Sequence, residues 1–284
     1  MKCEKWHALA NDFLIADRRD EHEGDPARFA ASLCDRHRGA GGDGLLAVEP
    51  SPDNRSDAFV SIWNADGSRA EISGNGLRCA AGFLLRSGDA DRCSIRTQAG
   101  TSDHRVIERA PPGCRIESRF PAPSFDPRVI GLDGKPAEGE PFERAWSGGA
   151  VRGTAVSVGN PHFVLFEGWT DDNWRVIGAE LESDPFFRNR VNVEFARVID
   201  RATLQVFVYE RGVGETASSG TGASASFAAA RRAGIVDAAV DVRLAGGTLS
   251  LREEPDGFLL TGSCERIGVF ETDPSWWERI NDSE

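Results

Sequence analysis

Two serines occupy matching turns, and each turn opens a run of apolar residues. Ser73 begins SGNGLRCAAGFLLRSG, and Ser219 begins SGTGASASFAAARRAG. Glycine lets the backbone approach a ligand closely, and the first N–H groups of a helix are unpaired donors at the positive end of its dipole. Two such turns facing one another would hold a small carboxylate between two proton-moving side chains. This arrangement suits inversion at an acidic carbon, the reaction of a racemase or epimerase.

The elements that precede the two turns are also alike. The serines are 146 residues apart, and the same offset places Asn64, at the end of a strand-like run, opposite Glu210 at the end of another. Because this offset is close to half of the 284-residue chain, we infer two similar domains that arose by duplication. The alternative is that both serines are ordinary helix N-caps, which are common.

Strand-like runs dominate the chain, with fewer helix-like runs between them. The strand-like runs alternate β-branched and aromatic residues and are bounded by Gly, Asp, Asn or Pro. The clearest helices are predicted over 26–37, 74–86 and 220–232. The pattern predicts an α+β fold with sheets wrapped around or packed on helices.

A domain boundary is expected in the Pro- and Gly-rich stretch 109–141. The segment SCERIGVFE, near the end of the chain, is expected to return and complete the sheet of the first domain. We therefore expect one domain of residues 1–118 plus 268–284 and a second of residues 119–267.

Composition argues against several classes of protein. The net charge of −12 and the lack of a basic stripe argue against a nucleic-acid or membrane partner. The start, MKCEKWHALANDFLIAD, predicts neither a signal peptide nor a membrane helix, so the cytoplasm is the expected location. Six cysteines without a CxxC pair are expected to be reduced core residues. No metal site is expected, because neither HExxH nor HxH occurs.

Cofactor signals are equally weak. The chain has three lysines, Lys2, Lys5 and Lys135, in a strand-like start and a turn, which are poor places for a pyridoxal phosphate Schiff base. The runs GAGGDG and GVGETA match the dinucleotide pattern but lack its strand-then-helix context. We therefore expect no cofactor.

Six ordered segments resemble the diaminopimelate epimerase family. They are HALANDFLIAD, CDRHRGAGGDGLLAVEP, WNADGSRAEISGNGLRCA, SVGNPHFVLF, NRVNVEF and YERGVGETASSGTGA. The resemblance implies an α/β roll of two pseudo-symmetric domains, each a mainly antiparallel sheet around a central helix, with the active site in the cleft between them. It also implies a cofactor-independent isomerase that inverts the α-carbon of LL- or meso-diaminopimelate, a precursor of lysine and peptidoglycan. Family members often form homodimers.

The binding residues of the family carry over by motif. The distal end of the substrate is expected at Asn11, Asn64, Asn160, Asn192 and Arg211. The reacting carboxylate is expected at Gly74, Asn75, Gly76, Gly220 and Thr221. Glu210 resembles the residue near the substrate's amino groups, and His162 lines the same cleft. Taken singly, each has a plain alternative, because Asn and Gly are common in turns and Arg often forms surface ion pairs.

The two base positions depart from the family. The resemblance implies a cysteine base in each glycine turn, whereas this sequence has Ser73 and Ser219 there. A thiol has a pKa of about 8.5, which falls further at a helix N-terminus, but a serine hydroxyl needs a base beside it. His162 and Glu210 are the candidates for that auxiliary base.

Three interpretations remain open. The first is an epimerase whose two cysteines were replaced, by design or in a natural homologue that lost fast turnover. The second is an isomerase of the wider superfamily, acting on another amino-acid-like substrate with His162 or Glu210 as base. The third is a non-catalytic binder of diaminopimelate-like amino acids.

Overall fold

The chain forms two compact units. The structure is a computed structural model that describes residues 1–19, 25–53, 55–70, 72–132 and 136–282. Unit 1 comprises residues 1–119 and 261–284, and unit 2 comprises residues 120–260. The chain passes from unit 2 back to unit 1 within one continuous strand, β17 (Gly257–Glu271). No turn marks this boundary in the chain. Lys135, considered above as a Schiff-base lysine, lies outside the described residues.

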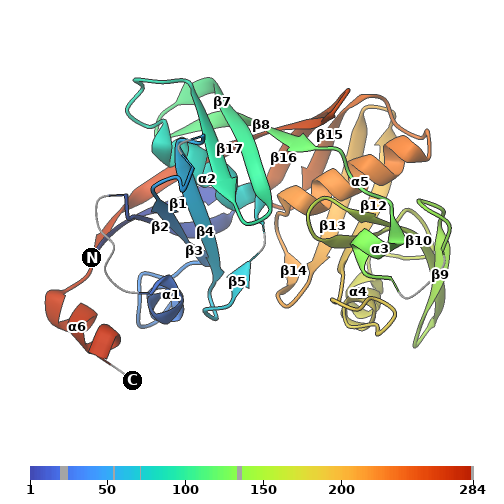
Figure 1. Cartoon of the computed structure of the whole chain (residues 1–284). Coiled ribbons are helices and arrows are strands. Elements are labelled where there is room, and N and C mark those ends of the chain that lie inside the picture. Colours follow the sequence, from blue (N-terminus) through green and yellow to red (C-terminus); the bar gives the residue numbers. More distant parts are fainter. Residues whose placement is uncertain (20–24, 54, 71, 133–135, 283–284) are drawn as a thin grey trace. The chain divides into compact units, whose positions relative to one another are not determined.

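Unit 1 is a sheet that closes around one helix (Figure 1). Its elements, besides β17, are β1 (Lys2–Ala8), β2 (Asn11–Asp17), α1 (Pro26–Cys34), β3 (Gly44–Glu49), β4 (Ala58–Asn64), β5 (Arg69–Ala70), α2 (Gly74–Leu84), β6 (Arg92–Thr97), β7 (Gly100–Ala110), β8 (Gly113–Pro121) and α6 (Pro274–Asp282). The strands pair in the order β17, β1, β2, β3, β4, β6, β7 and β8, and β8 pairs with β17. Cys3 lies opposite Phe270, so the segment SCERIGVFE does complete this sheet.

Unit 2 places its sheet around a second helix in the same way. Its elements are α3 (Pro127–Ile130), β9 (Phe142–Trp146), β10 (Gly149–Ser157), β11 (Pro161–Leu165), α4 (Trp174–Glu182), β12 (Asn192–Asp200), β13 (Thr203–Glu210), β14 (Gly214–Thr216), α5 (Gly220–Arg232), β15 (Ala239–Leu244) and β16 (Gly247–Glu254). The strands pair in the order β9, β10, β11, β12, β13, β15 and β16. The helix α5 contacts β10, β11, β12, β13, β15 and β16.

The two units repeat one order of pairings, which confirms the predicted duplication. In unit 1, β1 and β2 are antiparallel, β2 and β3 are parallel with α1 between them, and β3 and β4 are antiparallel. In unit 2, β10 with β11, β11 with β12 around α4, and β12 with β13 repeat these orientations. The parallel pairs β4 with β6 and β13 with β15 then bracket the central helices α2 and α5.

The two central helices are buried on all sides. Every residue from Gly74 to Phe83 is buried in α2, and alanine, glycine and serine make up most of α5. Small side chains let surrounding strands approach the helix from every direction, and a helix that is buried all round belongs to a core. The helix predicted over 220–232 is confirmed, whereas α1 ends at Cys34, three residues before its predicted end. The carboxylate of Asp35 accepts bonds from the backbone N–H groups of His37 and Arg38 and so turns the backbone out of the helix.

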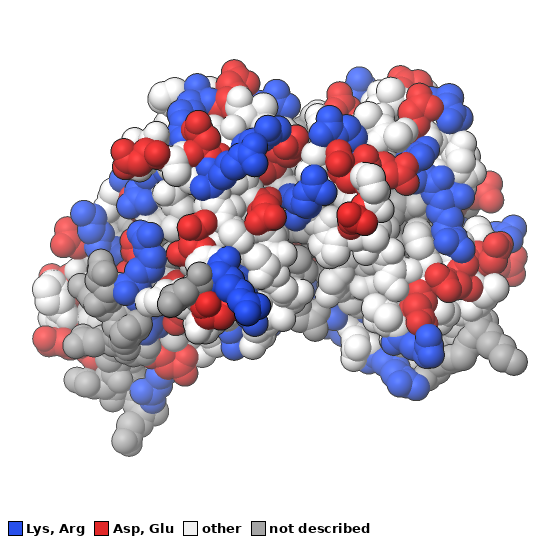
Figure 2. All heavy atoms as spheres, turned by 45° about the horizontal axis from the view of Figure 1, so that its top comes forward, with Lys and Arg blue, Asp and Glu red and all other residues white. Residues whose placement is uncertain are grey.

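Charges of both signs are interspersed on the face drawn in Figure 2. Ion pairs also join neighbouring elements among the described residues. Arg175 contacts Glu215 at 2.6 Å, and Arg197 contacts Asp171 at 2.6 Å. Among the described residues, no helix is both long enough and apolar enough to span a membrane.

Candidate functional site

Ser73 and Ser219 have nearly identical backbone geometry. Ser73 has φ −141° and ψ 113°, and Ser219 has φ −137° and ψ 119°. Each hydroxyl oxygen accepts a hydrogen bond of 3.0 Å from the backbone N–H three residues on, at Gly76 or Gly222. Both serines are therefore N-caps, and each oxygen lies at the positive end of a buried helix, where negative charge is stabilised.

In unit 1, a chain of amides leads away from the Ser73 turn. Asn75 donates to the side-chain oxygen of Asn11 at 3.1 Å, and Asn11 donates to the carboxylate of Asp43 at 2.8 Å. The structure thus brings Asn11 beside the first turn of α2. Asn64, at the end of β4, donates to Ser68 within its own exposed turn at 2.9 Å.

A buried cation lies under the same turn. The guanidinium of Arg78 has no exposed surface, and it donates to the carbonyl of Gly74 at 3.3 Å and to the side-chain oxygen of Asn75. No carboxylate forms an ion pair with Arg78 in the described part of the chain. Burial lowers the pKa of this guanidinium to about 10, so it stays charged at neutral pH. The turn 74–76 therefore offers an anion both backbone donors and an uncompensated positive charge.

In unit 2, alternation along two parallel strands separates a polar face from an apolar one. On β11 and β12, Phe163, Val193 and Phe195 belong to the apolar cluster that includes residues of α4. Their neighbours His162 and Glu194 lie on the other face, toward α5. A Cβ placed on Gly222 of α5 would stand 3.0 Å from Oε1 of Glu194. Successive strand side chains point to opposite faces, which accounts for this division.

His162 and Glu194 form a buried pair beside the Ser219 turn. Both side chains are fully buried, and Nδ1 of His162 lies 2.7 Å from Oε1 of Glu194. The other ring nitrogen lies 2.8 Å from the side-chain oxygen of Asn160. Burial raises the pKa of the Glu194 carboxyl, and this outweighs the lowering effect of His162. Because both ring nitrogens of His162 have partners, neither is left to take a proton directly from Ser219.

Asn192 holds two backbone segments together. Its side-chain nitrogen donates to the carbonyl of Pro161 at 2.9 Å, and its side-chain oxygen accepts from the N–H of Arg211 at 2.9 Å. The guanidinium of Arg211 in turn donates to the carbonyl of Asn189 at 3.0 Å. Asn192 is 3% exposed, so its contribution to a site is to fix the positions of the segments that carry Asn160 and Glu210.

Glu194 and Arg78 were not predicted as site residues. Arg78 carried a signal in the sequence, since it interrupts an apolar helix, whereas Glu194 alternates with Arg190 and Asn192 on the polar face of the strand-like run RVNVEFARVI and carried none. Charged residues are almost never fully buried without a partner, so such an interruption indicates either an exposed face or a special site. The sequence alone does not decide between these two outcomes.

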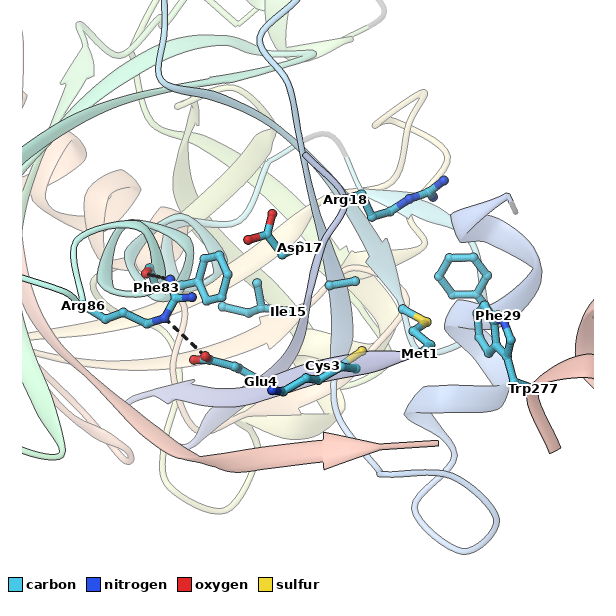
Figure 3. A pocket seen from close by; sticks show the side chains of 12 residues that line it. Met1, Cys3, Glu4, Ile15, Asp17, Arg18, Phe29, Phe83, Arg86 and Trp277 are labelled. Carbon is cyan, nitrogen blue, oxygen red and sulfur yellow. Dashed lines mark hydrogen bonds and ion pairs between the residues drawn. The ribbon is translucent and has the colours of Figure 1, made fainter. Parts of the chain in front are cut away.

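A separate pocket of about 520 Å³ lies at the opposite end of α2 (Figure 3). Phe83 and Arg86 line it, together with residues of β1, β2 and α1. Arg86 forms an ion pair with Glu4, with Nε 3.2 Å from Oε1, as the dashed line in Figure 3 marks. None of the predicted site residues lines this pocket.

Comparison with known proteins identifies the family. The family model of diaminopimelate epimerase matches residues 3–111 and 154–267, which include both serine turns. This chain belongs to the diaminopimelate epimerase family. It is 36% identical over 280 residues to the diaminopimelate epimerase of Xanthomonas axonopodis pv. citri, covering 98% of this chain and 97% of the relative. It is 38% identical over 272 residues to that of Xanthomonas campestris pv. campestris, covering 95% of each.

Solved structures agree on the fold. A hydroxyproline epimerase from Agrobacterium vitis, crystallised with trans-4-hydroxy-L-proline, aligns with a TM-score of 0.68 at 17% identity, over 96% of this chain and 92% of its own. At that identity the likeness speaks for the fold alone. Membership of the diaminopimelate epimerase family makes this protein an amino-acid epimerase or isomerase.

Proposed function

We propose that this protein binds diaminopimelate and acts at its α-carbon, with Ser73 and Ser219 in the two base positions. The observation that carries the proposal is the repeated N-cap, in which each serine oxygen accepts an N–H bond at 3.0 Å at the start of a central helix. A repeated site of this kind suits a reaction that treats the two faces of one carbon alike.

The chemistry is proton transfer without a cofactor. One base takes the Cα proton, the electron pair of the broken C–H bond delocalises into the substrate carboxylate, and the other base returns a proton to the opposite face. The Gly74–Gly76 turn, with the charge of Arg78 beneath it, would stabilise the carboxylate as negative charge develops. Gly220 and Thr221 would serve the same group from the second turn.

The distal end of the substrate is assigned to Asn11, Asn64, Asn160 and Arg211, with Glu210 at the amino groups, and Asn192 holds the segments that carry Asn160 and Glu210. Asn160 and Asn11 support this assignment, because each is already oriented by a neighbouring side chain. The proposal also includes a cytoplasmic location, and it includes a homodimer because the family resemblance implies one.

The decisive experiment follows the Cα proton of diaminopimelate by NMR in D2O. It compares the protein with the double variant Ser73→Cys/Ser219→Cys, and calorimetry measures binding to both. We expect exchange in the double variant, because a thiolate is accessible at neutral pH and is stabilised at a helix N-terminus.

Three outcomes separate the interpretations. Exchange by the cysteine form alone means an epimerase whose bases are replaced. Exchange by the serine form requires another base, which His162→Gln and Glu210→Gln variants would locate. Tight binding with no exchange in either form would refute the enzyme and leave an amino-acid binder.

A further inference from the structure

Glu194 has no role in any function considered so far, yet its surroundings are unusual. The carboxyl is fully buried, its Oε1 contacts His162, and its Oε2 has no hydrogen-bond partner among the described residues. An ionised carboxylate with one unpartnered oxygen is costly in a dry interior, whereas a neutral carboxyl group is much less so. The surroundings therefore favour a protonated Glu194, and the raised pKa of this carboxyl agrees.

A protonated Glu194 fixes the state of His162. Among the residues that the structure describes, the acceptor within reach of the Glu194 proton is the Nδ1 atom at 2.7 Å. A ring that accepts at Nδ1 carries its own proton on Nε2. Nε2 then donates across 2.8 Å to the side-chain oxygen of Asn160.

The orientation of Asn160 follows from that last bond. With its oxygen held by His162, Asn160 directs its NH2 group away from the ring, and no hydrogen bond occupies that group among the described residues. Asn160 is half-buried, which leaves part of the residue open to a ligand. An amide NH2 group pairs with a carboxylate oxygen and not with an ammonium group.

We infer that Glu194 is a positioning residue whose protonated carboxyl holds His162 as the Nε2–H tautomer and so turns the Asn160 amide to receive a carboxylate of the substrate. If the pair lost its shared proton, Nε2 would become an acceptor and the Asn160 amide would have to turn over. The inference deepens the proposed function and rests on it in one respect, the use of diaminopimelate as the ligand.

The first test reads the ring directly and needs no ligand. Nitrogen NMR of protein labelled at histidine distinguishes the imidazolium and the two neutral tautomers, and a His162→Gln variant assigns the signals among the five histidines. We expect a neutral His162 protonated on Nε2. Glu194→Gln should keep this state, because a Gln N–H can donate to Nδ1 in place of the acid. Glu194→Met, of similar length but without a donor, should mix the tautomers. An imidazolium, a proton on Nδ1, or a Gln variant that behaves like the Met variant would overturn the inference.

The second test measures binding of diaminopimelate by calorimetry. Glu194→Met should weaken binding about tenfold or more, the effect of losing one hydrogen bond to a charged group, while Glu194→Gln should bind as the parent protein does. Thermal unfolding of both variants separates this effect from loss of the fold. Unchanged binding in a Met variant with mixed tautomers would refute the assignment of Asn160. Absence of binding in every form would count against the proposed function, and the NMR result would still decide the role of Glu194.

Discussion

The stability of this protein should depend on pH through one buried histidine. His104 on β7 is 2% exposed, and its two ring nitrogens lie 2.8 Å from the hydroxyls of Ser102 and Ser118. Hydroxyls satisfy a neutral ring but supply no negative charge for an imidazolium. Burial therefore lowers the pKa of His104 from 6.5 to about 3, and the positive charge of Arg78 acts in the same direction.

The sign and size of the effect follow from linkage. The unfolded chain binds a proton at His104 near pH 6.5, and the folded chain does not until about pH 3. The neutral histidine thus costs no stability above pH 6.5, and the free energy of unfolding falls as the pH drops from 6.5 toward 3. The slope is about 1.4 kcal/mol per pH unit, so the loss between pH 7.5 and pH 5 is about 2 kcal/mol.

Urea unfolding of the protein and of His104→Gln at pH 7.5, 6 and 5 measures this loss. Carboxylates also titrate as the pH falls, so the informative quantity is the difference between the two proteins at each pH. That difference should change by about 2 kcal/mol in favour of the variant on going to pH 5. The exposed His37→Gln is the matched control and should run parallel to the parent. A His104 variant that also runs parallel would refute a buried neutral ring.

Three further substitutions test the packing, the caps and the surface. Gly82→Ala should lower the free energy of unfolding by about 1–3 kcal/mol in urea, because the new Cβ would stand 2.7 Å from Sγ of Cys264, and an unchanged value would contradict this packing of α2. Ser219→Ala should cost about 1 kcal/mol in thermal unfolding through loss of its cap, and no loss would mean that the bond is not formed in solution. Arg175→Ala should change stability by less than about 1 kcal/mol despite its 2.6 Å contact with Glu215, since that pair is exposed, and a larger loss would count against the screening argument.

The duplication was predictable because it rests on local signals. A serine before Gly-x-Gly is an N-cap signal wherever it occurs, and a repeated offset locates the second copy without knowledge of the sheet. The strand order was not predictable in the same way. It depends on pairings such as the parallel one of Ala58 with Ile95, which lie on either side of β5 and α2 in the chain and leave no local trace.

The chemistry beneath the turns was harder to predict than the turns themselves. Asn192 reads as a substrate ligand by motif, but its two polar groups hold the backbones of Pro161 and Arg211. Glu194 reads as one polar residue in a strand, and only the fold places it against His162 in a dry interior. Both depend on contacts between strands, which a one-dimensional pattern does not contain.

The duplicated halves have kept the same backbone at the turns and acquired different charges below them. In unit 1 the helix start is backed by the buried cation Arg78, which adds to the positive end of the helix dipole. In unit 2, Glu194 and His162 lie beside the corresponding helix start. In the state inferred above both side chains are neutral, so the pair adds no net charge there. The first turn is therefore the more favourable of the two for negative charge.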